Sequence, residues 1–167
     1  MLGGLIPGIL VACWLIYAHF NLPKIYVRKL TGRGGYNTLT RAIVDPRVTY
    51  PIAVLGQEVF ESRWKKWPHR LIFNATDRGI RERELRGHEA EVQVAEILGL
   101  RDNETLEEHR ARKAFIIKRG YAKSFSDWSE EEIVEAMRKH TKKCRKWALR
   151  WAGTLEKEYH KNYNRVG

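Results

Sequence analysis

Cysteine is scarce in this chain of 167 residues, with only Cys13 and Cys144 present. Two isolated cysteines form neither a disulfide framework nor a Cys-x-x-Cys metal motif. The chain also lacks the Gly-Lys-Ser/Thr ending of a phosphate-binding loop, a dinucleotide-binding glycine motif, a nucleophile elbow and an RNA-binding signature. Internal repeats and low-complexity tracts are missing as well. The sequence therefore carries no motif of the common nucleotide-binding or serine-hydrolase classes.

The bulk composition is that of a folded and strongly basic protein. Hydrophobic residues make up 43% of the chain and aromatic residues 11%, which is enough to build a small core. Lysine and arginine number 31 against 20 acidic residues, giving a formal net charge of +11. Such a surface attracts phosphates, anionic lipid headgroups or acidic proteins.

The first 23 residues contain no Asp, Glu, Lys or Arg. Their apolar run just reaches the length of about 20 residues that a helix needs to span a bilayer. We expect residues 1–23 to be an uncleaved membrane anchor; the alternative is a buried helix of the folded domain. Basic residues follow at once, beginning with Lys24 and Arg28. The positive-inside rule then places the rest of the chain in the cytoplasm.

The remaining residues, 24–167, are predicted to form a single basic α+β domain. Alternating apolar residues predict a strand over 24–30, and a β-branched-rich stretch predicts another over 38–44. Helical periodicity and capping signals predict helices over 51–67, 82–98, 105–120 and 129–159. The predicted fold class is mostly helical α+β: an N-terminal transmembrane helix, then a small sheet with about four packed helices.

Two pairs of polar residues fall at helical i, i+3 spacing on the predicted helices. Glu58 and Glu61 form one pair, and His88 and Glu91 form the other. Each pair shares a helix face, so each can direct two side chains to one point. Carboxylate and imidazole ligands suit zinc, iron or manganese. The alternative is a half-buried salt-bridge set, in which the positive charge comes from one of three arginines: Arg63, Arg83 or Arg86.

A family resemblance is carried by Tyr50-Pro51, an apolar ramp, Gly56-Gln57-Glu58-x-x-Glu61 and a downstream helix with Glu91. This order resembles small zinc-metallopeptidase-like (zincin-like) domains of phages and bacteria, which carry His-Glu-x-x-His. The resemblance covers residues 38–99 and implies Glu58 as the general base, with Glu61, His88 and Glu91 near a zinc ion. Gln57 and Glu61 stand where the two histidines belong. The chain thus looks like a degenerate member that keeps the fold and not the hydrolysis.

A second candidate site is basic and lies on the last predicted helix. Its cations occur with no acid between them and are interleaved with Trp147 and Trp151: Arg138, Lys139, Lys142, Lys143, Arg145, Lys146 and Arg150. Such a stripe can neutralise nucleic-acid phosphates or lie against anionic lipid. The alternative is a solvated face of a core helix whose tryptophans point inward.

Three functions follow as hypotheses. The first is a non-enzymatic interaction or structural protein. It would be membrane-attached and phage-derived, with a basic face that contacts lipid, nucleic acid or a protein partner. The second is a metal-dependent peptidase or hydrolase with Glu58 as general base. The third is a nucleic-acid-binding virion component.

Overall fold

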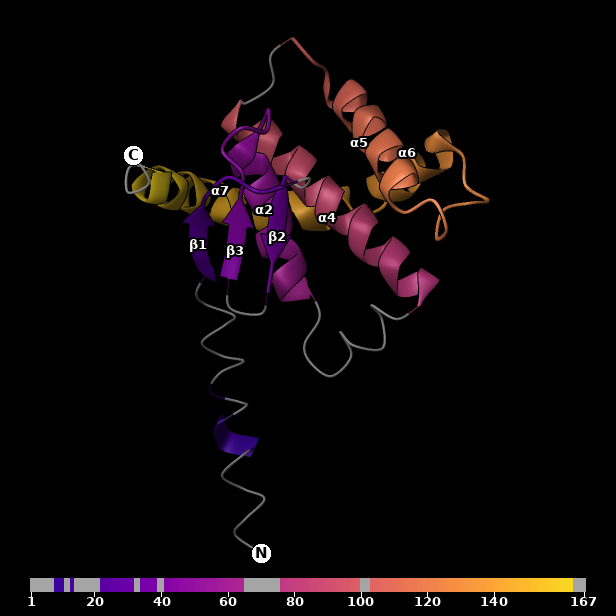
Figure 1. Cartoon of the computed structure of the whole chain (residues 1–167). Helices are drawn as coiled ribbons and strands as arrows, with labels where there is room; N and C mark the ends of the chain where they lie inside the picture. The colour runs from indigo at the N-terminus through magenta and orange to yellow at the C-terminus, as the bar shows by residue number, and fades with distance from the viewer. Residues whose placement is uncertain are drawn as a thin grey trace, which may run out of the picture.

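The computed structural model describes residues 8–10, 13, 22–31, 34–38, 41–64, 76–99 and 103–163. A small sheet lies on one side of the molecule, and helices pack behind it and beside it (Figure 1). The strands and α2 come first in the chain. The long helices α4 and α7 follow later and cross behind them in the view of Figure 1.

The sheet has the strand order β1-β3-β2. Its strands are β1 (Lys24–Val27), β2 (Gly35–Asn37) and β3 (Arg41–Val44). β1 and β3 are parallel, with Val27 opposite Val44, whereas β2 is antiparallel to β3, with Gly35 opposite Val44. The strands predicted over 24–30 and 38–44 contain β1 and β3. β2 begins at Gly35, in a stretch where glycines indicate a turn, because pairing to β3 outweighs the weak strand propensity of glycine.

Helix α2 (Pro51–Trp64) packs against the inner face of the sheet and crosses α4 closely. Proline suits the first turn of a helix, where its missing N–H costs no hydrogen bond. The crossing is tight at Gly56, where an added Cβ would lie 2.9 Å from Val94 Cγ2. Only glycine therefore lets the two helices approach to this distance.

Helix α4 (Asp77–Leu98) begins five residues before the predicted start at Glu82. Thr76 caps it by accepting a hydrogen bond from the Gly79 N–H at 3.1 Å, and Asp77 adds a carboxylate in the first turn. Gly99 ends it in the left-handed conformation, at φ 62°. Thr76 and Asp77 thus set the start of the helix ahead of Glu82.

Capping boxes start the next two helices, α5 (Leu106–Gly120) and α6 (Glu130–Arg138). The boxes join Thr105 to Glu108 and Ser129 to Glu132, as the sequence predicts. The single helix predicted over 129–159 is wrong. It divides at Lys139 and His140 into α6 and α7 (Thr141–Tyr163), because α6 packs against α5 whereas α7 packs against α4 and β1.

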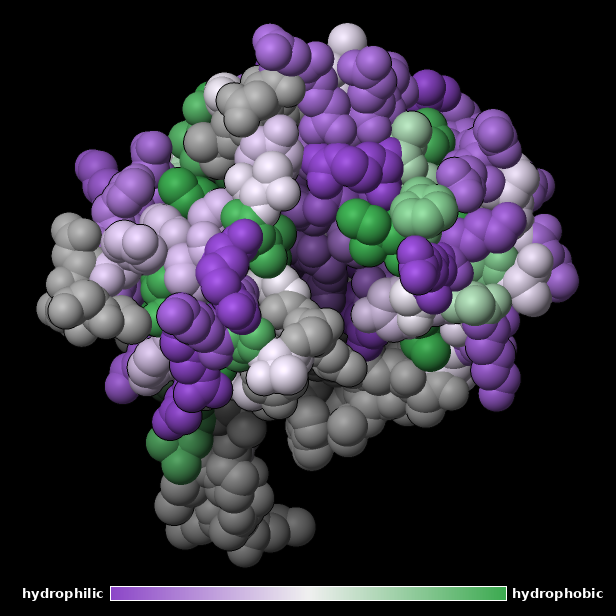
Figure 2. Space-filling view, turned by 45° about the horizontal axis from the view of Figure 1, so that its top comes forward, coloured by the Kyte–Doolittle hydropathy of each residue, from purple (hydrophilic) through white to green (hydrophobic). Residues whose placement is uncertain are grey.

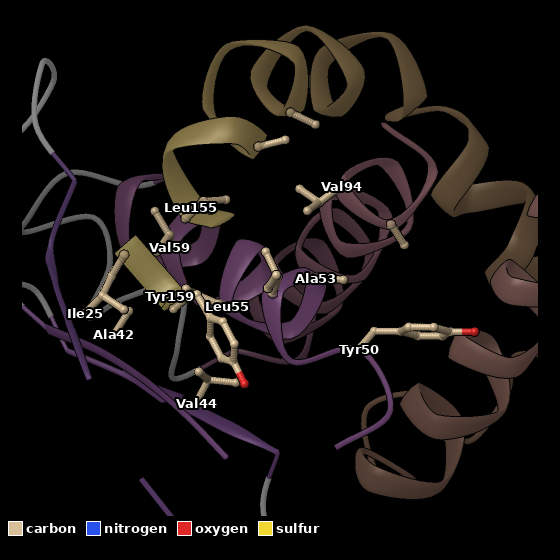
Figure 3. Close-up of a cluster of buried hydrophobic side chains, with 14 of the residues drawn as sticks. Ile25, Ala42, Val44, Tyr50, Ala53, Leu55, Val59, Val94, Leu155 and Tyr159 are labelled. Carbon is tan, nitrogen blue, oxygen red and sulfur yellow. The ribbon is translucent and has the colours of Figure 1, made fainter. Parts of the chain in front are cut away.

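The main core lies between the sheet, α2, α4 and α7. Figure 3 shows Ile25 and Val44 from the strands converging on Leu55 of α2 and on Leu155 and Tyr159 of α7. A second cluster fills the space between α4, α5 and α6 and includes Ile117, Phe125 and Ile133. A third, small cluster joins Phe60, Ala90 and Cys144, so α4 contributes to all three apolar clusters and links them.

The fold prediction was wrong in its transmembrane helix. Among the described residues, none of the helices combines the length and apolar character that a membrane crossing needs. Most of the predicted anchor, residues 1–23, lies outside the described residues. The cytoplasmic orientation was inferred from the charges beside that anchor.

Candidate functional site

An open cleft of about 800 Å³ lies between β2, α2, α4 and α5. Figure 2 shows the molecule hollowed between its two halves, with hydrophilic side chains inside the hollow. The four residues predicted as a group, Glu58, Glu61, His88 and Glu91, all line this one cleft. The structure therefore brings the two predicted pairs together, with α2 carrying one and α4 the other.

Glu58 is buried, with 8% of its surface exposed. Its carboxylate accepts a hydrogen bond from the side-chain amide of Asn37 on β2. Burial raises the pKa of Glu58 to about 7, although the Asn37 hydrogen bond acts in the opposite direction. Gly35 makes room for this carboxylate, since a Cβ there would lie 2.6 Å from Glu58 Oε1. Among the described residues, no lysine or arginine forms an ion pair with Glu58.

Glu61 lies one turn further along α2 and is held by an amide and a guanidinium. Gln57 Nε2 donates to Glu61 Oε1 at 2.8 Å, and Arg83 Nε lies 3.7 Å from Glu61 Oε2. Burial raises its pKa well above the usual range, and the charges of Glu84 and Glu58 add to this. A Cβ on Gly87 of α4 would overlap Glu61 Oε1, so glycine is needed where α4 passes this side chain.

Glu84 is a fifth member of the group that the sequence analysis missed. Arg83 donates to Glu84 Oε1 at 2.7 and 2.9 Å, and the Tyr121 hydroxyl also hydrogen-bonds to Glu84. His88 Nε2 lies 3.7 Å from Glu84 Oε2. The signal was present in the spacing, because Glu84 precedes His88 by four residues and Glu91 by seven and so shares their helix face.

Glu91 has the most complete set of partners in the cleft. It forms an ion pair with Lys113 of α5, and His88 Nδ1 lies 3.1 Å from its Oε2. Burial opposes its ionisation, but the Lys113 ammonium and His88 outweigh this and lower the pKa of Glu91 to about 2. Glu91 is therefore a compensated carboxylate, unlike Glu58.

The salt-bridge alternative describes half of the group. Arg83 lies beside Glu61 and Glu84, as that alternative expects. Arg86 pairs with Glu82 at 2.8 Å, and the side chain of Arg63 lies outside the described residues. Arg83 and Lys113 thus balance Glu84 and Glu91, whereas among the described side chains Glu58 has the Asn37 amide as its donor.

The donor set does not fit the zinc site that the family resemblance implies. Gln57 hydrogen-bonds to Glu61, Glu61 also faces Arg83, and Glu91 is held by Lys113 and His88. In the described part of the chain, no group of three or more His, Cys, Asp or Glu side chains is placed to hold a metal ion. The metal-ligand roles of Glu61, His88 and Glu91 therefore stay predictions.

The predicted basic residues divide into two sets. Arg138 is paired with Glu107 at 2.5 Å and with Glu135 at 3.0 Å, and Arg145 Nη1 lies 3.5 Å from Gln93 Oε1. The others are exposed, and within the described residues they form no ion pair: Lys139, Lys142, Lys143, Lys146 and Arg150. Trp147 and Trp151 pack against the cores, as expected for tryptophans on the inner face of a core helix.

Comparison with known proteins finds no matching family model, no matching curated protein and no matching solved structure. The descriptions phage-derived, virion component and metallopeptidase-like are therefore without support from known proteins. No match supports them, and the described residues contain no metal-binding group.

Proposed function

We propose that the cleft is the active site of a hydrolase in which Glu58 transfers the proton. The observation that carries this proposal is a buried carboxyl with a pKa of about 7 that lines an open cleft. An acid–base catalyst works best when its pKa lies near the working pH. Perturbed carboxyl groups in clefts are typical of functional sites.

Glu58 and Glu61 have complementary roles in this proposal. At neutral pH part of the Glu58 population is ionised and accepts a proton from the attacking water. Glu61, whose pKa burial raises well above the usual range, holds a proton in this proposal and donates it to the leaving group. One water is consumed, its proton passes to Glu58, and the leaving group takes the proton of Glu61. Exchange with solvent through the open cleft then restores both side chains.

The energetic cost of the arrangement favours a functional interpretation. Burying carboxyl groups with incomplete compensation destabilises a fold, and replacing them with apolar residues would remove that penalty. The chain instead shapes its backbone around them, with Gly35 beside Glu58 and Gly87 beside Glu61. Natural proteins retain such unfavourable placements mainly where activity requires them.

The lining of the cleft favours an extended polar substrate. Gly34, Gly35 and Asn37 line it, and β2 is the edge strand of the described sheet. The unpaired backbone groups of an edge strand can hydrogen-bond to an extended chain such as a polypeptide. Tyr50 and Tyr121 add aromatic surface to the walls. A volume of about 800 Å³ is within the range of ligand pockets.

The test is a panel of fluorogenic peptide, ester, glycoside and phosphoester substrates assayed from acidic to alkaline pH. We expect turnover of one class, peptide first, with a half-maximal rate near the pKa of Glu58, about 7. Glu58→Gln removes the base and should lower the rate by about 100-fold or more. The control is Glu135→Gln on exposed α6, which should leave the rate unchanged.

Two results would contradict the proposal. No turnover of any class, or equal turnover by Glu58→Gln, removes Glu58 from catalysis. Turnover that is lost on chelation and restored by zinc replaces the proposal with a metal-dependent mechanism.

A further inference from the structure

The outer side of α7 carries five exposed cations that share one helix face: Lys142, Lys143, Lys146, Arg150 and Lys157. We name this set the α7 basic face. Lys142, Lys146 and Arg150 follow at intervals of four residues, and Lys143, Arg150 and Lys157 at intervals of seven. Both intervals keep side chains on the same side of a helix. Of the two acids of α7, Glu158 falls outside this face by the same geometry, whereas Glu156, which follows Lys142 by 14 residues, lies at its edge.

The cations of the α7 basic face differ in their charge pairing from three arginines elsewhere in the molecule. Arg47 pairs with Asp45, Arg112 with Glu104 and Arg138 with Glu107, each through a short ion pair. Within the described residues, none of the five cations of the α7 basic face forms an ion pair. Like charges one turn apart destabilise a helix by about 0.2–0.5 kcal/mol per pair. The face therefore opposes helix stability, and an anionic partner would remove that repulsion.

We infer that the α7 basic face binds the phosphate backbone of duplex nucleic acid without reading sequence. From Lys142 to Lys157 the helix rises about 22 Å, at about 1.5 Å per residue. One strand of a duplex presents about six phosphates over that length. Lysine and arginine contacts to phosphate provide affinity and orientation but no base recognition. This activity is independent of the cleft.

A lipid surface fits the α7 basic face less well. Helices that lie on bilayers insert an apolar face between the headgroups. The apolar face of α7 is already occupied, since Ala148, Leu155 and Tyr159 are buried in the main core. Leu149 is the large apolar residue of α7 that lies exposed beside the cations. Single strands are also a poorer match, because Trp147 and Trp151 are partly buried in the cores and offer no open platform for base stacking.

The affinity for duplex DNA should depend steeply on salt concentration. Neutralising five phosphates predicts a slope of about −4 to −5 for log K against log salt concentration. Replacing three of the cations should lower the magnitude of that slope by about 3 and weaken binding about tenfold or more at low salt.

The experiment measures fluorescence polarisation of a labelled DNA duplex of arbitrary sequence with the full chain. The test variant is Lys142→Gln/Lys146→Gln/Arg150→Gln. The matched control is Arg78→Gln/Arg119→Gln/Lys123→Gln, which changes the net charge equally at exposed positions elsewhere on the molecule. We expect the test variant to bind the duplex more weakly and with a smaller slope of log K against log salt concentration. The control should keep both the affinity and the slope. A second variant, Lys143→Gln/Lys157→Gln, should reproduce the loss in part, and urea midpoints verify that all variants fold.

Three outcomes overturn the inference. Equal weakening by test and control variants shows that net charge alone attracts DNA. An absence of duplex binding at low salt removes the activity. Binding to phosphatidylserine vesicles without binding to the duplex assigns the face to a lipid surface instead.

Discussion

Two buried glutamates, Glu89 on α4 and Glu58 on α2, differ in how their charge is compensated. Glu89 is fully buried and accepts hydrogen bonds from Arg110 at 2.8 and 2.9 Å, from Thr141 at 2.9 Å and from Gln93 at 2.8 Å. Glu58 is nearly as buried, has the Asn37 amide as its hydrogen-bond donor, and lines the cleft.

The difference separates a structural carboxylate from a reactive one. A buried charge with a bidentate arginine and two neutral donors is satisfied, so it fixes how α4, α5 and α7 meet. A buried carboxyl that is not compensated by a cation has a raised pKa, and Glu58 can therefore exchange a proton at neutral pH. A buried carboxylate whose charge is fully compensated, such as Glu89, holds the helices of the fold together. A buried carboxyl group that no cation compensates, such as Glu58, marks the candidate site.

The largest expected effect is on stability, when the buried Glu89 carboxylate loses its arginine. Arg110→Ala leaves the Glu89 carboxylate buried without its cation, which should lower the free energy of unfolding by about 3–5 kcal/mol. Urea denaturation measures it. The control, Arg119→Ala, alters an exposed arginine of the same helix and should change stability by less than about 0.5 kcal/mol. A small effect at Arg110 would mean that the arginine is not what stabilises the buried Glu89 carboxylate.

The next effect concerns Gly87, where the absence of a side chain leaves space for Glu61. Gly87→Ala places a Cβ against Glu61 Oε1 and should destabilise the fold by about 2–3 kcal/mol. Adding Glu61→Ala should restore most of this loss, because the clash disappears. Gly153→Ala on the same kind of helical backbone meets nothing within 4 Å and should stabilise by about 0.5–1 kcal/mol. Additive effects of Gly87→Ala and Glu61→Ala would contradict the close approach of α4 to this side chain.

An effect of opposite sign, which depends on pH, is expected at Glu58. In the folded state its pKa is about 7, against 4.5 in the unfolded chain, so folding favours the protonated form. Stability from this group therefore falls as the pH rises from about 4.5 to about 7 and stays low above that. Glu58→Gln should stabilise the protein by about 3 kcal/mol at about pH 8 and by almost nothing at about pH 4. Denaturation at the two pH values measures this, and equal effects at both would refute the raised pKa.

The smallest effect tests the amide partner of Glu58. The Asn37 hydrogen bond lowers the pKa of Glu58 against the effect of burial, so Asn37→Ala should raise that pKa further. Carbon NMR of labelled glutamate side chains follows the titration. Asn162→Ala removes an amide that donates to a backbone carbonyl on α7 and should leave the Glu58 titration unchanged. An unchanged pKa in Asn37→Ala would show that another donor fixes the carboxylate.

Local spacing predicts which residues share a helix face, and the placement of Glu58, Glu61, His88 and Glu91 in one cleft agrees with it. The partners that decide their protonation come from elsewhere in the chain. Lys113 is 22 residues from Glu91, and Asn37 is 21 residues from Glu58. Such pairings depend on how α5 and β2 pack, which periodicity within one element does not encode.

The division between α6 and α7 was missed for a related reason. Met137 and Cys144 are seven residues apart, so the apolar stripe continues in phase across the break. A stripe specifies which side of a helix is buried, not which neighbour covers it. Here Met137 belongs to the cluster with α5, and Cys144 packs with Phe60 and Ala90. The chain therefore changes direction without leaving a mark in the hydrophobic pattern.

The break at Lys139 and His140 has a consequence for local unfolding. α5 and α6 share the second cluster with Leu85 and Val92 of α4, whereas α7 belongs to the main core with the sheet. We therefore expect the α5–α6 hairpin to open as a unit of its own, so that its amides exchange with deuterium through an opening smaller than global unfolding. Each such opening carries Lys113 away from Glu91, so that Glu91 loses its lysine and becomes easier to protonate. Hydrogen exchange of α5 is therefore linked to the protonation of the cleft.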